Sequence, residues 1–231
     1  MSVGMIILAG GVGSRMGKAS PKQFHLLGGK PIIIHTLDKV AKLSSVDEVV
    51  ITCPAAHITE MESLLANHRF ERQFECIEGG ETRQASVYEG LKRLRAHDTV
   101  VIHEAVRPFV TAEDFIALID SPHANAIYGI EIPFTVLKGS SVVEGTLLRR
   151  ELVNVQLPQK FQTVTLIAAH EAAMAAGADS TEDASLLFDH CGTDIAILPG
   201  SEYNIKITHP VDIIIGETIY EQYILGKAPR S

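Results

Sequence analysis

Short apolar runs alternate with longer amphipathic segments along the first half of the chain. The apolar runs predict strands at Met5–Leu8, Glu48–Cys53, Phe74–Glu78 and Thr99–His103. Apolar residues that recur at spacings of three and four predict helices between them, at Pro31–Leu43, Ile58–His68 and Thr82–Arg95. Strands separated by helices are typical of βαβ units, so we expect an α/β fold with a mostly parallel sheet flanked by helices.

The second half of the chain changes character after a further strand at Ala126–Ile132. Residues 133–156 contain β-like pieces (Thr135–Leu137, Ser141–Val143, Leu152–Val155) with glycine turns, and we interpret them as an arm that projects from the sheet. Beyond the arm we expect helices at Val164–Ala176 and Glu182–Cys191, a strand at Asp194–Leu198 and a last helix after Pro210. Without a repeat or linker, residues 1–231 are expected to form a single domain.

The composition limits the possible partners. A formal net charge of −8 argues against a general binder of nucleic acid or anionic membranes, because both need a basic surface. Cys53, Cys76 and Cys191 lie far apart in sequence, which argues against a disulfide framework or a structural zinc site. The first apolar run is too short to span a membrane and follows no basic segment, so we expect a cytoplasmic protein.

A glycine-rich turn follows the first predicted strand, where a parallel sheet presents its ligand crevice. Glycines let backbone N–H groups approach a phosphate or a base edge. The turn has neither the Gly-Lys-Ser/Thr ending of a P-loop nor a clean dinucleotide fingerprint. With Arg15 and Lys22 on one extended loop, it could wrap a triphosphate. The alternative is a tight strand-to-loop connection with both cations solvated.

Two segments here carry a family resemblance. Leu8-Ala9-Gly10-Gly11-Val12-Gly13-Ser14-Arg15-Met16-Gly17 resembles the opening of the nucleotidyltransferases that activate sugar and polyol phosphates. The later Pro21-Lys22-Gln23 is similar to the branch of methylerythritol phosphate and ribitol phosphate cytidylyltransferases. The resemblance implies a Rossmann-like, GT-A-like fold and transfer of CMP from CTP to a polyol phosphate. It also implies Mg²⁺ or another divalent cation as cofactor, and a homodimer.

A second matching segment is implied to hold the cytosine and the ribose. Residues 79–87 are similar to the family's Gly-Gly-x-x-Arg-x-x-Ser-Val. Taken with the opening, the implied nucleotide-binding residues are Leu8, Ala9, Gly10, Gly11, Gly13, Gly79, Gly80, Glu81 and Ser86. From the residues alone, the same segment is an N-capped helix in which Glu81 or Thr82 satisfies free amides.

The segment His103-Glu104-Ala105-Val106-Arg107-Pro108 stands at the carboxyl end of a predicted strand and resembles the family's His-Asp-Ala-Ala/Val-Arg-Pro. The family's aspartate binds Mg²⁺. This chain has Glu104 in its place, which still offers hard oxygen ligands. Arg107 matches the family's arginine for the substrate phosphate. Without the resemblance, this glutamate and arginine would be interpreted as a structural ion pair.

The remaining matches concern the acceptor side. Thr135 and Arg149 correspond to arm residues that grip the polyol phosphate from the neighbouring subunit in relatives, although the arm could be solely a dimer clasp. Residues 204–208 resemble the family's closing Asn-Ile-Lys-x-Thr, which implies Lys206 near the triphosphate and Thr208 near the substrate. The chain departs from the family pattern at Phe134 and Leu157.

Two further groups of residues are assigned structural roles. Residues 181–185 resemble the family's Thr-Asp-Asp-Ala-Ser, and we interpret Glu182 and Asp183 as helix-capping acids. Several histidines match no catalytic signature or metal-ligand spacing, and we expect them on the surface or in helices. They are His25, His35, His170 and His190.

The expected reaction is in-line attack by a substrate phosphate oxygen on the α-phosphorus of CTP. Because that oxygen is already ionised, catalysis should come from positioning and charge neutralisation, with Arg15, Lys22 and Lys206 as catalytic cations. Methylerythritol phosphate is the first candidate acceptor and ribitol phosphate the second. A non-catalytic nucleotide-binding paralogue is the alternative of another class. A nucleotide-sugar glycosyltransferase ranks last, because the chain has no Asp-x-Asp triplet.

Overall fold

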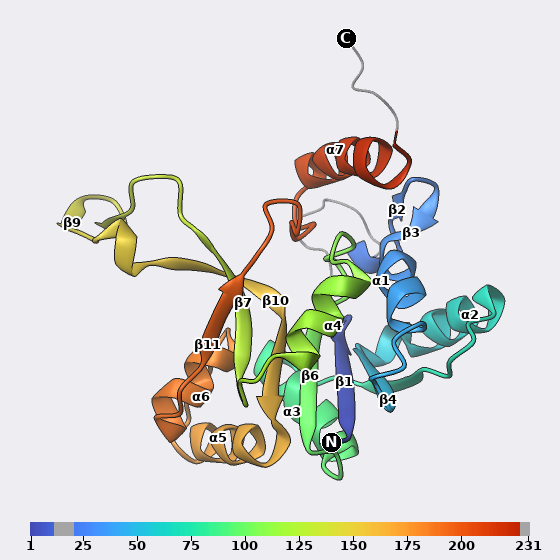
Figure 1. Ribbon diagram of the computed structural model, residues 1–231, viewed down its shortest axis with the longest axis horizontal. Helices are drawn as coiled ribbons and strands as arrows, with labels where there is room; N and C mark the ends of the chain where they lie inside the picture. The colour runs from blue at the N-terminus through green and yellow to red at the C-terminus, as the bar shows by residue number, and fades with distance from the viewer. Residues whose placement is uncertain (12–20, 227–231) are drawn as a thin grey trace.

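In the computed structural model, which describes residues 1–11 and 21–226, a sheet of seven strands has the order β11-β7-β10-β6-β1-β4-β5 (Figure 1). Its strands are β1 (Val3–Leu8), β4 (Glu48–Cys53), β5 (Glu75–Glu78), β6 (Thr99–Glu104), β7 (Ala126–Glu131), β10 (Val153–Gln162) and β11 (Ala196–Pro199). Strand β10 runs antiparallel to both of its neighbours, and the other pairings in this sheet are parallel. The predicted mostly parallel sheet is confirmed.

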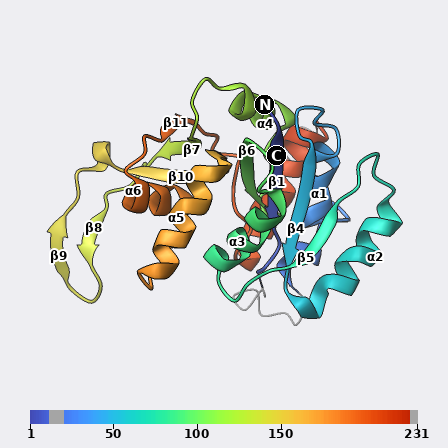
Figure 2. The same cartoon turned by 90° about the horizontal axis from the view of Figure 1, so that it is seen from below.

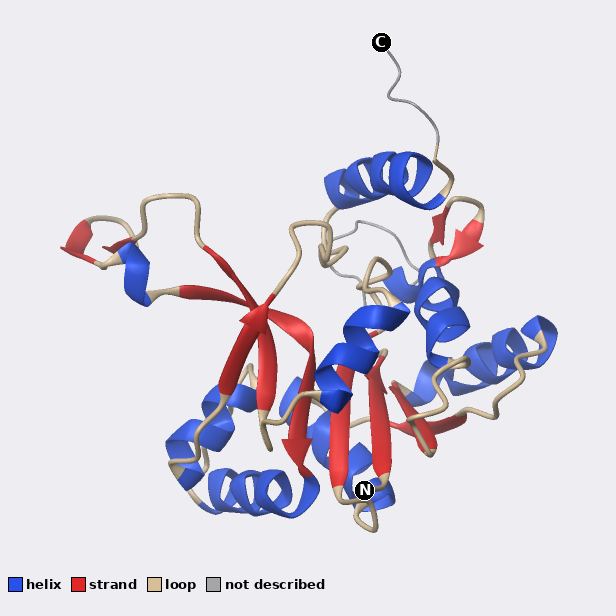
Figure 3. Cartoon of the chain, viewed as in Figure 1, coloured by secondary structure: helices blue, strands red, loops and turns tan. Residues whose placement is uncertain are grey.

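Helices cover both faces of the sheet, because successive side chains of each strand point to opposite faces (Figures 2 and 3). One face packs against α1 (Ile32–Val40), α2 (Ile58–His68) and α4 (Ala112–Asp120). The other packs against α3 (Arg83–Leu94), α5 (Thr163–Ala175) and α6 (Asp183–Cys191). In β1, Met5 and Ile7 belong to the first core, and Ile6 and Leu8 to the second. The central strand therefore anchors both cores.

A third apolar cluster joins segments that are far apart in sequence. Its buried members are Leu27, Ile32, Val106, Phe109, Ile207 and Ile219. The cluster connects a small hairpin, β2 (Leu26–Leu27) and β3 (Lys30–Pro31), with α7 (Pro210–Ile219) and the π-helix η5 (Tyr220–Ile224). The Gly28 N–H donates to Glu217 Oε1 at 2.8 Å. A Cβ on Gly28 would lie 2.3 Å from Tyr220 Cε1, so glycine is needed for this close approach.

The arm (residues 133–156) projects from the sheet between β7 and β10 (Figure 1). It contains the antiparallel pair β8 (Leu137–Gly139) and β9 (Val143–Thr146), followed by the 3-10 turn η4 (Arg149–Glu151). Large apolar side chains of the arm are exposed in the single chain, namely Phe134, Leu137, Val142, Val143, Leu147 and Leu148. Such a concentration of exposed apolar side chains is typical of an interaction surface.

Each predicted helix or strand corresponds to an element of the same type in the structure. The predicted bounds of α2 and β4 match the observed bounds. The arm strands begin later than predicted. Helix α4 was missed, although it starts with a capping box in which Thr111 and Asp114 each accept from the other's backbone N–H. The strand predicted at Leu152–Val155 is longer in the structure, where β10 continues to Gln162. The structure places Pro158 where the register with β7 shifts, and the strand continues beyond it.

No helix in the described ranges, 1–11 and 21–226, combines the length and the apolar character needed to cross a membrane.

Lys160 provides a test of how β10 is fixed against α4. Its side chain is buried, and Nζ donates to the Ile119 carbonyl at 3.2 Å and to the Ser121 carbonyl and Oγ, each at 2.8 Å. Lys160→Met keeps the side-chain length but leaves these acceptors unpaired, so we expect a loss of about 2–3 kcal/mol in the free energy of unfolding, measured with urea. The exposed Lys42→Met should stay within about 0.5 kcal/mol of wild type. Equal stability of the two variants would contradict this role of Lys160.

Candidate active site

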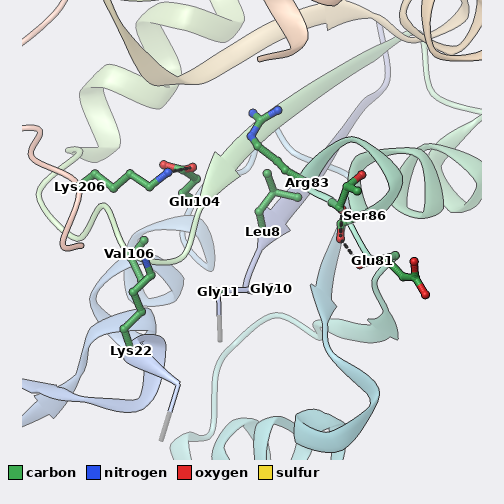
Figure 4. Close-up of a pocket in the computed structure, with 12 residues that line it drawn as sticks. Leu8, Gly10, Gly11, Lys22, Glu81, Arg83, Ser86, Glu104, Val106 and Lys206 are labelled. Atoms are coloured by element: carbon green, nitrogen blue, oxygen red, sulfur yellow. Dashed lines mark hydrogen bonds and ion pairs between the residues drawn. The ribbon is translucent and has the colours of Figure 1, made fainter. Parts of the chain in front are cut away.

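A cleft of about 250 Å³ opens at the carboxyl ends of the adjacent strands β1 and β6 (Figure 4). Its walls are formed by Gly10 and Gly11 at the start of the glycine-rich turn, the turn before α3, the end of β6 and two lysines. The lining residues are Leu8, Gly10, Gly11, Lys22, Gly80, Glu81, Thr82, Arg83, Ser86, Glu104, Val106 and Lys206. This is the edge of a parallel sheet at which ligands bind.

Gly11, the last described residue of the glycine-rich turn, lies directly against Lys22. A Cβ on Gly11 would be 2.8 Å from Lys22 Cε, so a side chain at this position would displace the lysine. Lys22 starts the 3-10 helix η2 (Lys22–Phe24) and is 8% exposed. The next residue, Gln23, donates from Nε2 to the Ala9 carbonyl at 2.7 Å. This hydrogen bond ties η2, and Lys22 with it, to the end of β1.

The turn before α3 is held by the first residues of that helix. Thr82 is the N-cap, and its Oγ1 accepts from the Ala85 N–H at 3.1 Å. Ser86 Oγ lies 2.9 Å from the Thr82 carbonyl and 3.2 Å from the Gly80 carbonyl. A Cβ on Gly80 would lie 2.3 Å from Ala85 Cβ, so only glycine permits this packing. The segment is therefore an N-capped helix and a wall of the cleft at the same time.

Glu104, the last residue of β6, bridges two cations. Its Oε1 accepts from Lys206 Nζ at 2.6 Å, and its Oε2 accepts from Arg107 Nε at 2.9 Å. Arg107 also donates from Nη1 to the Asn204 carbonyl at 2.9 Å. Burial alone would raise the pKa of Glu104, but Lys206 and Arg107 outweigh it and lower this pKa to about 2. Glu104 is therefore an anion at neutral pH that links β6 to residues 204–206.

Arg83, the first residue of α3, lines the cleft and is neutralised from α6. Its Nη2 lies 2.7 Å from Asp183 Oδ2 and 3.9 Å from Glu182 Oε1. Burial alone would raise the pKa of Asp183, which is 1% exposed, but Arg83 and His170 together outweigh burial and lower this pKa. Asp183 Oδ1 also lies 3.3 Å from Nε2 of the fully buried His170. Asp183 is therefore a buried counterion.

The capping interpretation consequently holds for only one of the two acids. Glu182 is the N-cap of α6, and its side chain accepts from the Asp183 N–H at 3.1 Å. For Asp183 the interpretation was wrong, because its buried carboxylate pairs with Arg83. Two histidines expected on the surface or in helices, His35 and His170, are buried helix residues. Neither is among the lining residues of the cleft.

Most residues expected to bind the nucleotide lie at the cleft. Leu8, Gly10, Gly11, Gly80, Glu81 and Ser86 line it. Ala9 and Gly79 do not, and their N–H groups donate to the carbonyls of Thr52 at 2.9 Å and Cys53 at 2.8 Å. Gly13 and Arg15 fall in residues 12–20, outside the described residues.

The residues expected to bind the acceptor are not brought together within one chain. Arg107 lies beside the cleft, paired with Glu104. The Thr208 N–H donates to Asp212 Oδ2 at 2.7 Å, and the residue does not line the cleft. Thr135 and Arg149 lie on the exposed arm, where Arg149 Nη1 donates to the Pro133 carbonyl at 3.2 Å. A second chain would be needed to bring arm and cleft together if the arm serves a partner.

A divalent cation would find few protein ligands here. Among the residues the structure describes, no group of three or more His, Cys, Asp or Glu side chains could hold a metal ion. Glu104 offers the oxygen ligands that Mg²⁺ prefers, although both oxygens contact cations. This donor set fits an ion that is held mainly by phosphate oxygens, with Glu104 as a supplementary ligand.

The sequence model of the 2-C-methyl-D-erythritol 4-phosphate cytidylyltransferase family matches residues 3–222. This chain belongs to that family. It is therefore a nucleotidyltransferase of the CTP-dependent cytidylyltransferase class.

Two proteins similar to this cytidylyltransferase are named for different acceptors. It is 36% identical over 222 residues to 2-C-methyl-D-erythritol 4-phosphate cytidylyltransferase of Geobacillus kaustophilus, which covers 95% of this chain and 97% of that protein. It is 30% identical over 228 residues to ribitol-5-phosphate cytidylyltransferase of Lactiplantibacillus plantarum, with 94% and 97% covered. Among solved structures, 4-diphosphocytidyl-2C-methyl-D-erythritol synthase of Anaerococcus prevotii aligns with a TM-score of 0.82 and 28% identity, covering 95% and 96% of the two chains.

The structure adds residues to this cytidylyltransferase site that sequence analysis did not assign. Thr82, Arg83 and Val106 line the cleft, and Asp183 neutralises Arg83. The sequence could have indicated Arg83 as a site residue, because it is the arginine of the Gly-Gly-x-x-Arg match. Nothing in the sequence indicated that Asp183 would contact Arg83, since a hundred positions separate the two.

The Arg83–Asp183 pair can be tested by removing one charge. Asp183→Asn leaves Arg83 facing a neutral amide in a buried setting, so we expect a loss of about 3–5 kcal/mol in the free energy of unfolding, measured with urea. Asp189→Asn is the matched control, because it makes the same change at an exposed position of α6. If Asp183→Asn were as stable as Asp189→Asn, the proposed neutralisation of Arg83 by Asp183 would be wrong.

Proposed function

We propose that this protein transfers CMP from CTP to 2-C-methyl-D-erythritol 4-phosphate and releases pyrophosphate. The observation that carries the proposal is the cleft, where Lys22 and Lys206 lie with a glycine-rich turn at the carboxyl ends of β1 and β6 (Figure 4). Backbone N–H groups and two lysines suit a triphosphate, and the turn at Gly80 offers backbone groups to a base. The 36% identity to the Geobacillus kaustophilus enzyme supports the acceptor.

The chemistry follows from charge and position. The attacking oxygen belongs to the acceptor phosphate and is ionised at neutral pH, so no general base has to remove a proton. We assign Lys22 and Lys206, with Arg15 from the sequence, to offset the charge that develops around the α-phosphate and the departing pyrophosphate. When bound, Mg²⁺ or another divalent cation supplies further neutralisation and orients the triphosphate, with Glu104 as its protein ligand. Holding both substrates in line supplies the remaining rate acceleration.

The acceptor side of the proposal involves a homodimer. We assign Arg107 and Thr208 of one subunit, with Thr135 and Arg149 of the partner's arm, to the polyol phosphate. Two observations support this division. The arm projects from its own sheet, and its apolar side chains are exposed in the single chain (Figure 1). A partner that covers them would remove that apolar surface from water. The whole chain acts in this proposal as one nucleotidyltransferase domain in the cytoplasm, which agrees with its free cysteines.

Ribitol 5-phosphate is the second candidate acceptor. The 30% identity to the Lactiplantibacillus plantarum enzyme extends over 94% of this chain, so overall similarity separates the two acceptors only modestly. The chain also carries Phe134 and Leu157 where the family pattern has other residues. Phe134 lies on the arm, so this departure bears on the acceptor side more than on the CTP side.

Pyrophosphate release tests the proposed reaction. The protein is incubated with CTP and Mg²⁺, and methylerythritol phosphate and ribitol phosphate are supplied in parallel. Release with methylerythritol phosphate alone is the expected result, and Lys22→Ala should reduce turnover at least about a hundredfold while its stability changes little. Lys92→Ala, an exposed lysine of α3, serves as the control. Release of pyrophosphate with ribitol phosphate alone would make ribitol phosphate the acceptor in place of methylerythritol phosphate. Binding of CTP without pyrophosphate release with either acceptor would support the non-catalytic alternative.

Mixing two inactive variants tests whether the arm serves the partner subunit. Lys22→Ala disables the cleft, and Arg149→Ala disables the arm. In a mixed dimer, one cleft retains Lys22 and receives Arg149 from the partner. Random assembly should therefore restore about a quarter of the wild-type activity when equal amounts are unfolded and refolded together. No recovery above the separate variants, in a sample shown to contain mixed dimers, would place Arg149 outside the partner's site.

A further inference from the structure

Each oxygen of the Glu104 carboxylate accepts a hydrogen bond from a cationic side chain, and the two cations differ in exposure. Oε2 accepts from Arg107, whose side chain is 11% exposed and is also fixed to the Asn204 carbonyl. Oε1 accepts from Lys206, whose side chain is 40% exposed. Arg107 is thus held from two sides and is only slightly exposed. Lys206 has a partly exposed, flexible side chain. Within the described part of the chain, its ion pair is the one with Glu104 at 2.6 Å.

Lys206 and Glu104 also share the cleft in which the proposed function places CTP. A triphosphate in this cleft would compete with Glu104 for the lysine, because both are anionic acceptors for the same ammonium group. It would also be repelled by the Glu104 carboxylate if nothing else neutralised that charge. A lysine can exchange one anionic acceptor for another by side-chain rotation, whereas Arg107 would have to give up two contacts.

We propose that Lys206 exchanges Glu104 for the triphosphate when CTP binds, and that the released carboxylate oxygen turns to the divalent cation carried by the nucleotide. Arg107 stays on Glu104 and keeps the carboxylate in place. In this arrangement the Lys206–Glu104 pair disfavours CTP that arrives without a metal ion, because such CTP would leave Oε1 of Glu104 without a cation while Arg107 stays on Oε2. The inference rests on the proposed function, since CTP is the ligand that drives the exchange.

Equilibrium binding without turnover tests the exchange. Affinities of the wild type and Glu104→Gln are measured by calorimetry for CTP and for inorganic tripolyphosphate in EDTA, and for CTP with Mg²⁺. Glu104→Gln removes the competing anion, so metal-free CTP and tripolyphosphate should bind about three- to tenfold more tightly than to wild type. The gain in CTP affinity on adding Mg²⁺ should be smaller in the variant than in the wild type.

Cytidine and a second variant provide the controls. Cytidine has no phosphates, so its affinity should be the same for Glu104→Gln and wild type. Glu202→Gln makes the same charge change at an exposed position outside the cleft lining, and it should leave all affinities unchanged. Tripolyphosphate affinity that is unchanged or lower in Glu104→Gln would overturn the exchange. If cytidine affinity fell as well, Glu104 would be assigned to building the cleft instead. A wild type that binds CTP under no condition would refute the proposed function itself.

Discussion

The bridge that Glu104 forms between Lys206 and Arg107 is the interaction on which the candidate active site depends. It joins the end of a central strand to a segment 102 positions later in the chain. Without it, Lys206 in the cleft wall and Arg107 beside the cleft would lose this shared counterion, and nothing in the described contacts would fix the position of Lys206. The bridge also explains how an acid in a buried position stays ionised, since the two cations lower its pKa to about 2. One carboxylate thus sets both the shape and the charge of the cleft.

The rest of the fold holds the ends of this bridge in place. The Ile207 N–H donates to the Val106 carbonyl at 2.9 Å. The segment that contains Glu104 and the segment that contains Lys206 are therefore joined by a backbone hydrogen bond as well as by side chains. The apolar cluster that includes Val106 and Ile207 adds α7 and the β2–β3 hairpin to the same assembly. The chain that carries Lys22 leads directly into that hairpin. Sites built from distant segments need this kind of packed support to hold their geometry.

The parts of the structure that local pattern determines were predictable, and the pairings between distant residues were not. The apolar runs of β1, β4 and β6 and the glycine-rich turn locate the sheet and its ligand edge. The resemblance at residues 79–87 points to a second wall of the cleft. The ion pair of Glu104 with Arg107, offered as the structural alternative, is present in the structure. Neither pattern shows that the distant Lys206 joins this pair, or that Asp183 neutralises Arg83 from another helix. Such contacts depend on how helices settle against the sheet, which sequence periodicity does not specify. The end of β10 was also not visible in the pattern, because a register shift lets the strand continue past Pro158.

The central claim is that Lys206 leaves Glu104 for the triphosphate while Arg107 remains. The most direct measurement is a crystal structure of the wild-type protein with CTP and Mg²⁺ bound. The account predicts Lys206 Nζ within hydrogen-bond distance of a phosphate oxygen, Arg107 Nε still on Glu104 Oε2, and Glu104 Oε1 turned to the metal ion. A complex in which CTP fills the cleft and Lys206 still contacts Glu104 alone would contradict it.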